Sequence, residues 1–263
     1  MAYLKMYGGQ ISSPGPTIVT WADGTDAEIA AMLEAHYAGI IDVTAIWNVG
    51  DERVVSLSAM SATGVGESHV AQNVKMVLMN VGGKTLVTPI NGKTECAFIV
   101  GQKDLLTGQN VAEAGYMNST DTSIGGWDAC ARRTWCNSVY KNALPSTLIG
   151  IFKEHQNITA DSGLSATAIT SNDYFALPSE KELYGSTTYA NATAESSNAQ
   201  FEYYKTPSNR IKRRYGDYVT WYWQRSPANY NSENKYFCCV KGSGEAVVGN
   251  ASGNNNISPF GVI

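Results

Sequence analysis

The sequence predicts an α+β fold with short mixed strands, two to three helices and long loops. Three observations predict it: helical spacing of apolar residues in two segments, β-like alternation between residues 53 and 100, and short β runs without helical pattern in residues 203–263. No internal repeat or linker divides the 263-residue chain. We therefore expect one main domain, residues 41–263, preceded by an N-terminal extension, residues 1–40.

The extension is expected to carry one amphipathic helix over residues 25–38. Thr25 and Glu28 have the spacing of a capping box, and Gly39 is placed to end the helix. The apolar residues that recur at helical spacing are Ile29, Met32 and Leu33.

Strands are expected in the next part of the chain. Residues 53–59 alternate apolar and polar side chains after the turn-forming residues 48–51, and residues 73–80 are β-like before a Gly-Gly pair. These two runs predict an antiparallel pair. Residues 85–90 and 96–100 add two further short strands.

A second helix is expected over residues 127–144, which contain neither Pro nor Gly. Apolar side chains recur there every four residues, at Trp127, Ala131, Trp135 and Val139. Pro145 suits the first turn of a short third helix. The inward side chains of that helix are expected to be Leu148, Ile151 and Phe152.

The last third of the chain predicts loops and hairpins. Residues 173–185 indicate a brief strand and then a turn capped by Ser179 and Glu182, with long loops around it between residues 161 and 200. A hairpin-rich half-sheet follows. Its beginning holds an aromatic cluster, Tyr203, Tyr204, Tyr215, Tyr218, Trp221, Tyr222 and Trp223.

Composition excludes several classes of protein. The formal net charge of -4 gives no general attraction to nucleic acid, and the basic run from Lys205 to Arg214 is expected to be solvated or paired with the chain's own carboxylates. Neither a signal peptide nor an apolar span long enough for a bilayer is present, so we expect synthesis in the cytoplasm without membrane insertion. The five cysteines are expected to be buried free thiols.

The sequence nominates no catalytic or metal centre. Two Gly-Lys-Thr tripeptides, at residues 83–85 and 92–94, lack the earlier glycine of a phosphate loop and are expected at turns or strand ends. His36, His69 and His155 have no partner at metal-ligand spacing. No nucleophile with a neighbouring base can be named. We therefore predict no enzyme activity, no metal and no cofactor.

Residues 222–263 have the composition of an adaptable recognition surface. Tyrosine offers a large contact area at low entropic cost, and Asn, Ser and Gly offer adjustable hydrogen bonds. The same residues also dominate ordinary turns, so composition alone leaves open a loop-rich surface that binds nothing.

A resemblance bears on that choice. The stretches WYWQRSP, YFCCV and SPFGVI look like the closing signature of a domain of unknown function widespread in gut bacterial phages and prophages. Earlier stretches that resemble the same domain are WNVGDER, FIVGQKDLL, GGWDACARRTWCNSVY, ALPSTLIGIF, DYFALPSEKELYG and EYYKTPSNRIK. Together they span most of the chain from Trp21 onward.

The resemblance implies a C-type-lectin-like fold in its sulfatase-modifying or phage variant. Many similar proteins are variable proteins of diversity-generating retroelements, in which adenine-rich codons of a C-terminal repeat are altered while the fold stays fixed. Under this interpretation the variable binding segment is residues 222–263. Its scaffold would be Trp223, Arg225, Ser226, Pro227, Phe237, Cys238, Val240, Pro259 and Phe260. Its ligand-binding positions would be Tyr222, Asn229, Tyr230, Asn231, Ser232, Lys235, Tyr236, Lys241, Ser243, Glu245, Val247, Val248, Asn250, Ser252, Asn254, Asn255 and Asn256. Val247 and Val248 depart from a polar set and could instead belong to a strand core.

The implied function is host recognition at a phage tail tip. We expect a non-enzymatic virion protein that contacts a host cell-surface protein or glycan and other virion tail proteins, with a homotrimer as an analogy only. The calcium-binding tripeptides of sugar-binding C-type lectins are absent. Two alternatives stay open. The first is an enzyme or enzyme remnant of the sulfatase-modifying (formylglycine-generating) fold, which needs a reactive thiol at Cys238 or Cys239, and the second is a purely structural virion protein.

Overall fold

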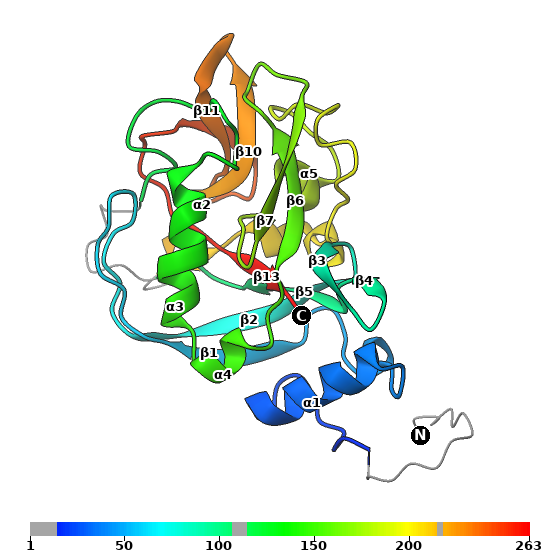
Figure 1. Cartoon of the computed structure of the whole chain (residues 1–263). Helices are drawn as coiled ribbons and strands as arrows, with labels where there is room; N and C mark the ends of the chain where they lie inside the picture. The colour runs from blue at the N-terminus through cyan, green and yellow to red at the C-terminus, as the bar shows by residue number, and fades with distance from the viewer. Residues whose placement is uncertain (1–14, 107–114, 215–217) are drawn as a thin grey trace.

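The computed structural model describes residues 15–106, 115–214 and 218–263. In these residues the fold is α+β, with few helices and strand pairing that is antiparallel in every sheet (Figure 1). The predicted class is confirmed at this level. Tyr215, one of the seven residues of the expected aromatic cluster, lies outside the described residues.

Helix α1 (Asp26–Tyr37) confirms the helix expected in the N-terminal extension. The capping box of Thr25 and Glu28 is formed, and Gly39 follows the last turn with φ +75°. The Tyr37 hydroxyl donates to the carbonyl of Ile263 (3.1 Å) and accepts from the N–H of Ala97 (2.9 Å). The helix therefore packs on the same hydrophobic core as the C-terminus of the chain.

The first sheet has the order β1-β2-β5-β13. Its strands are β1 (Glu52–Leu57), β2 (Gln72–Val81), β5 (Phe98–Gln102) and β13 (Phe260–Val262). The expected antiparallel pairing of β1 with β2 is confirmed. The C-terminal strand β13 returns to pair with β5. The two ends of the described chain therefore meet at this sheet and its core.

The second sheet has the order β4-β3-β6-β7. Its strands are β4 (Lys93–Glu95), β3 (Thr85–Ile90), β6 (His155–Ala160) and β7 (Ala168–Asp173). Most of β7 lies in a region expected to be loops, and that expectation was wrong. The buried side chains of these two strands include Asn157, Thr159, Ser171 and Asp173. A strand whose inward face is polar shows no apolar alternation in the sequence.

The second predicted helix is shorter than expected. Helix α2 (Ala131–Trp135) continues through a π-helical turn (Cys136–Tyr140) into α3 (Lys141–Ala143), while residues 127–129 form turns and Cys130 is the extended N-cap residue. The side-chain amide oxygen of Asn118 accepts the first helical N–H, that of Ala131 (2.9 Å), and so caps the helix from a distant loop. Helix α4 (Ser146–Ile149) follows Pro145 as the short third helix, and Leu148, Ile151 and Phe152 are buried as expected.

Helix α5 (Glu180–Tyr184) has the capping box expected of Ser179 and Glu182. The third sheet, with the order β10-β11-β12, forms the expected hairpin-rich end. Its strands are β10 (Tyr222–Tyr230), β11 (Glu233–Val240) and β12 (Ala246–Asn250), and a small two-stranded sheet, β8 (Arg213–Arg214) with β9 (Tyr218–Val219), precedes it. The β10–β11 hairpin extends away from the first sheet, at the opposite end of the molecule from α1 (Figure 1).

Candidate functional site

The turn of the β10–β11 hairpin presents four consecutive exposed residues, Asn229 to Ser232. We call these four residues the hairpin tip. Asn231 and Ser232 have φ values of +53° and +55°, as the two central residues of a type I′ turn require. Most of β10 before the tip is buried, from Tyr222 to Ala228. The chain therefore projects a short polar turn from a strand that is held on both faces.

Strand β10 is anchored by a bulge. The pairing register with β11 shifts between Trp223 and Pro227. A bulge redirects side chains, and here the Arg225 guanidinium reaches α5, where it donates to both carboxylate oxygens of Glu182 at 2.5 and 2.6 Å. The Ser226 hydroxyl accepts the N–H of Glu180 at 2.9 Å. The Arg-Ser-Pro motif thus joins the hairpin to the start of α5.

Glu182 is the centre of a buried charge cluster. Lys84 of the β2–β3 connection also donates to it at 2.5 Å, and Lys84, Glu182 and Arg225 are all buried. Burial alone raises the pKa of Glu182, but the two cations outweigh this and hold it at about 2. The cluster thus holds one anion between two cations inside the fold, and it joins segments from three parts of the chain.

Glu180, two residues before Glu182, organises a loop next to the hairpin. One carboxylate oxygen of Glu180 accepts the backbone N–H groups of Thr188, Tyr189 and Ala190 at 3.0, 2.9 and 2.7 Å. Burial raises the pKa of this carboxyl group, while these N–H groups lower it. The loop is therefore pinned by a side chain that is itself fixed on a helix.

The pinned loop contacts the hairpin directly. The carbonyl of Tyr189 accepts the N–H of Asn229 at 2.8 Å, and Ala190 forms a bridge with Ala228. The Tyr189 ring lies 6.3 Å from that of Tyr230, which lies 5.2 Å from that of Tyr236. Both contacts are edge-to-face, an arrangement that favours fixed ring orientations. Sequence reasoning missed Tyr189 and Glu180 because they lie outside the C-terminal segment. The Ser179–Glu182 capping box was the available signal for this region.

The expected ligand-binding positions are not all displayed. Tyr222 is completely buried and its hydroxyl donates to the carbonyl of Arg210, while Asn256 is buried with its side-chain amide donating to the carbonyl of Trp221. Both positions are therefore corrected to scaffold. Tyr236 is only 9% exposed, and its hydroxyl donates to Glu233.

The remaining positions divide into separate groups. Val247 packs on the main core and Val248 on a small second cluster, so both belong to the strand core. The β11–β12 turn carries Lys241, Ser243 and Glu245 at the end of β11 away from the hairpin tip. The other exposed or half-buried positions are Lys235, Asn250, Ser252, Asn254 and Asn255. The structure thus brings Asn229–Ser232 together but places Asn254–Asn256 along a different segment, which returns toward Trp221.

The cysteines offer no accessible thiol. All five are free and buried, as expected. Burial raises the pKa of Cys238 and Cys239 well above the ordinary value, so neither carries the thiolate that a nucleophile needs. Cys238 and Cys239 also point to opposite faces of β11: Cys238 lies in the small cluster and Cys239 in the main core.

Other motifs have structural roles. The glycines of both Gly-Lys-Thr tripeptides, Gly83 and Gly92, lie in left-handed turns at strand ends, as expected. In the basic run, Lys205 pairs with Glu202 and Arg214 with Glu67, which confirms the pairing with the chain's own carboxylates for these two residues. Among the described residues, no group of three or more metal-ligating side chains converges, and no helix is long and apolar enough to cross a membrane.

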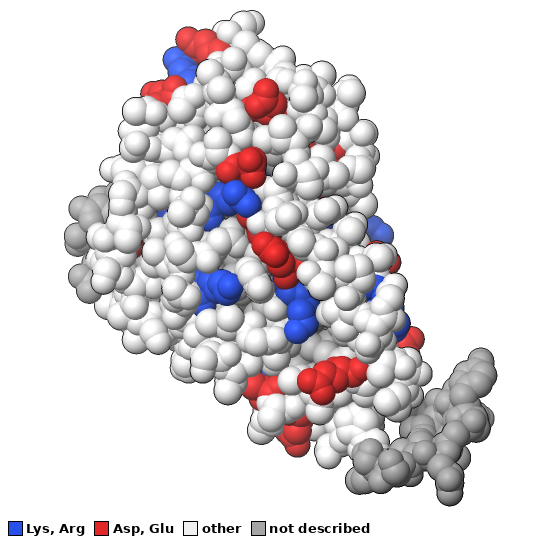
Figure 2. Space-filling model, viewed as in Figure 1, with Lys and Arg blue, Asp and Glu red and all other residues white. Residues whose placement is uncertain are grey.

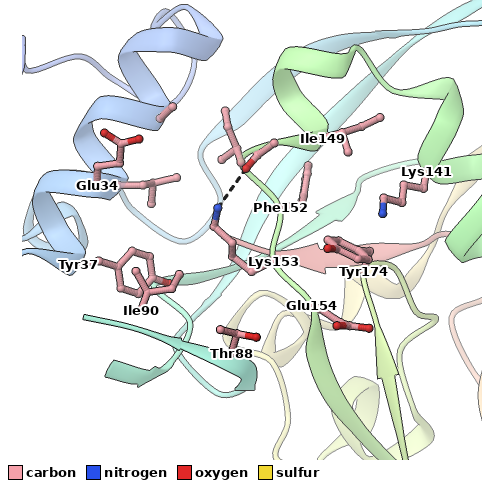
Figure 3. A pocket seen from close by; sticks show the side chains of 14 residues that line it. Glu34, Tyr37, Thr88, Ile90, Lys141, Ile149, Phe152, Lys153, Glu154 and Tyr174 are labelled. Carbon is pink, nitrogen blue, oxygen red and sulfur yellow. Dashed lines mark hydrogen bonds between the residues drawn. The ribbon is translucent and has the colours of Figure 1, made fainter. Parts of the chain in front are cut away.

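A groove of about 510 Å³ lies between α1, β3 and the segment from α4 to β6 (Figure 3). Next to the groove, the pairing register of β3 with β6 is confined to Leu86 and His155, and Pro89 has no N–H with which to extend it. The apolar lining of the groove is formed by Ala30, Leu33, Ile90, Ile149, Ile151 and Phe152. Two acidic and two basic side chains also line the groove, so their formal charges cancel. The Nζ atom of one of them, Lys141, lies 3.3 Å from the centre of the Tyr174 ring. We find no acid–base pair or concentrated charge there.

Charged residues make up only 16% of the sequence, so the surface has few of them. Figure 2 shows most of one face formed by uncharged side chains, with acidic and basic residues in a band across its middle, at its lower edge and in a small group at the top. At the hairpin end, Lys235 pairs with Glu233 at 2.8 Å. The hairpin tip itself has no charged side chain.

These features define a class of protein: an α+β domain in which a buried ion cluster fixes a projecting hairpin. Residues 101–261 match a family described as a domain of unknown function, DUF6273, so the chain belongs to this family. The matched region contains α2 to α5, the third sheet and the charge cluster except Lys84. Neither the curated proteins nor the solved structures contain a match to the chain.

Proposed function

We propose that this protein is a non-enzymatic recognition protein, and that its hairpin tip contacts a host cell-surface protein or glycan. In this proposal it is a phage tail-tip or receptor-binding protein, a variable protein of a diversity-generating retroelement, with a C-type-lectin-like fold in the sulfatase-modifying or phage variant. The phage origin rests on the resemblance of the WYWQRSP, YFCCV and SPFGVI stretches.

One observation carries the proposal. Four consecutive exposed, uncharged residues project from a strand whose preceding seven residues are buried and locked to α5. No residue of the hairpin tip belongs to a hydrophobic core cluster or an ion pair, so its side chains can vary while the framework stays intact. Such a separation between framework and contact residues is what an adaptable binding surface requires.

The test has two parts. In the first, Asn229→Ser, Tyr230→Ala and Ser232→Gly are combined, with Asn231 kept for the turn, and thermal unfolding is measured. We expect Tm to change by no more than about 4 °C, because the lost ring contacts of Tyr230 and the relieved strain at Ser232 act in opposite directions and each is about 1 kcal/mol. Trp223→Ala, at a completely buried scaffold position, is the control and is expected to cost about 3–5 kcal/mol.

In the second part, the wild-type protein and the triple variant are compared on a glycan array and on a panel of intact gut bacteria. Binding by the wild-type protein that the variant loses supports the proposal. Equal binding by both proteins contradicts it. If neither protein binds any array member or cell, the purely structural virion role is favoured instead.

A further inference from the structure

We infer that the recognition surface is composite: the loop from Ser186 to Ala194 forms its second half, Tyr189 is a contact residue, and the surface fits a recess on a partner protein. This inference rests on the proposed function and adds a segment outside residues 222–263. It also selects a protein over a glycan as the partner.

The first step is that the loop and the hairpin tip form one surface. The backbone hydrogen bond from Asn229 to Tyr189 and the bridge between Ala190 and Ala228 extend the third sheet by one short segment beside β10. The half-buried Tyr189 ring lies against Tyr230, which is 40% exposed. Any partner large enough to cover Tyr230 therefore meets Tyr189 as well.

The second step is that this half of the surface is preorganised. Three backbone N–H groups of residues 188–190 converge on one oxygen of Glu180, and the Glu180 side chain is buried. A loop held in this way loses little conformational entropy when it binds, which favours affinity. Tyr189 is thus a fixed anchor beside a turn whose own residues are adaptable.

The third step concerns the kind of partner. Small ligands and single sugars are bound in concave pockets lined by the protein. The hairpin instead projects from the body of the molecule, and the end that carries it is convex in the space-filling view (Figures 1 and 2). A projecting turn with aromatic anchors inserts into a concave site on another protein, as long antibody loops do. The side chains of the hairpin tip and Tyr189 are uncharged, and the neighbouring Glu233 and Lys235 pair with each other, so we expect the recess to be recognised by shape and apolar contact more than by charge.

A display experiment tests the inference. Asn229, Tyr230, Asn231 and Ser232 are randomised in the full chain, and the library is selected in parallel on hen egg-white lysozyme, a protein with a deep cleft, and on maltoheptaose, an uncharged oligosaccharide. Each selected binder is then made with Tyr189→Ala, with Tyr189→Phe and with Tyr218→Ala. Tyr218 is the matched control, an exposed tyrosine on β9 outside the surface.

We expect lysozyme binders whose Kd rises about tenfold with Tyr189→Ala, as for an aromatic anchor, and by less than about twofold with Tyr218→Ala. Tyr189→Phe retains the ring and is expected to retain most of the affinity. The Tm of each variant is measured as well, so that weaker binding through a lost contact can be distinguished from weaker binding through unfolding.

Three results would overturn the inference. If Tyr189→Ala changes Kd by less than about twofold in every folded binder, the loop is not part of the surface. If binders arise only on maltoheptaose, the partner class is wrong. Both results leave the proposed function standing, whereas a folded library that yields no binder on either probe removes the proposed function together with the inference.

Discussion

Ser232 is held in the left-handed region of backbone conformation, with φ +55°. A residue with a Cβ pays roughly 1–2 kcal/mol there, and type I′ turns favour Asn followed by Gly for this reason. The sequence has Asn at the first central position and Ser at the second. The hairpin tip therefore carries local strain at a position where the side chain does not contribute to the core.

We predict that Ser232→Gly stabilises the protein by about 0.5–1 kcal/mol, because relief of this strain exceeds the added entropy of the unfolded chain. Urea unfolding at pH 7 measures the change. The same substitution at Ser243, which lies in the β11–β12 turn without a positive φ, is the control and is expected to be neutral or slightly destabilising. A loss of stability at Ser232 would contradict the prediction.

Glu195 is a completely buried carboxyl group near the charge cluster. Burial raises its pKa to about 7, against the attraction of Arg225 and the hydroxyl of Ser226, which lower it. Between pH 4.5 and 7 the folded protein therefore retains a proton that the unfolded chain has released. Folding becomes less favourable as the pH rises through this window, and the loss is complete above the folded pKa.

We predict that Glu195→Gln removes this dependence. The variant is expected to match the wild-type protein near pH 5 and to exceed its stability by about 3 kcal/mol at pH 8, because each pKa unit corresponds to about 1.4 kcal/mol. Urea unfolding of both proteins at pH 5, 6, 7 and 8 measures the difference. A difference that stays constant over this range would show that Glu195 is not the titrating group.

At the scale of elements, α5 and β10 are joined by Glu182 and Arg225. The two residues are separated by 43 positions, and Lys84 joins them from 98 positions before Glu182. The ring of Phe260 on β13 lies 5.6 Å from the Lys84 ammonium and 6.0 Å from the Arg225 guanidinium. The charge cluster therefore fixes how the hairpin, α5 and the C-terminal strand sit against one another.

We predict that Glu182→Gln costs about 3–5 kcal/mol, because it leaves two buried cations without their anion. Glutamine retains the capping-box geometry at this position, so the loss reports the charge. The control is Lys205→Met, which breaks the exposed pair with Glu202 and is expected to cost less than about 1 kcal/mol. Urea titrations measure the free energy of unfolding of both variants and of the wild-type protein. Similar losses in the two variants would contradict the role of the cluster.

At the scale of the whole molecule, the C-terminus completes the core. All four residues from Phe260 to Ile263 are buried, β13 pairs with β5, and the carbonyl of Ile263 accepts from Tyr37 of α1. The first sheet is complete, and the hydrogen bond from Tyr37 of α1 to Ile263 is formed, only when residues 260–263 are in place. Such pairing between distant segments is the part of a fold that is slowest to form.

We predict that deletion of residues 260–263 abolishes cooperative unfolding at 25 °C. The near-ultraviolet circular dichroism of the buried tryptophans is expected to collapse while part of the far-ultraviolet signal remains, as in a state without fixed packing. Phe260→Ala is a less severe change in the same strand. We expect this variant to unfold cooperatively, with a free energy of unfolding lower by about 3–5 kcal/mol. A truncated protein with the wild-type urea midpoint would refute this role of β13.

The sequence alone was sufficient for features that depend on neighbouring residues. The capping boxes of Thr25 and Ser179, the β1–β2 pair and the short helix after Pro145 all follow from local spacing and turn chemistry. These features follow because periodicity and caps act within one or two turns of chain.

Only the tertiary structure decided how these elements meet. It placed Glu182 against Lys84 and Arg225, set Tyr189 beside Tyr230, and buried Tyr222 and Asn256. The polar inward faces of β6 and β7 and the capping of α2 by Asn118 were equally invisible. In each case the partner lies far away in the chain, and polar residues that satisfy one another in the interior have the same local pattern as residues exposed to solvent.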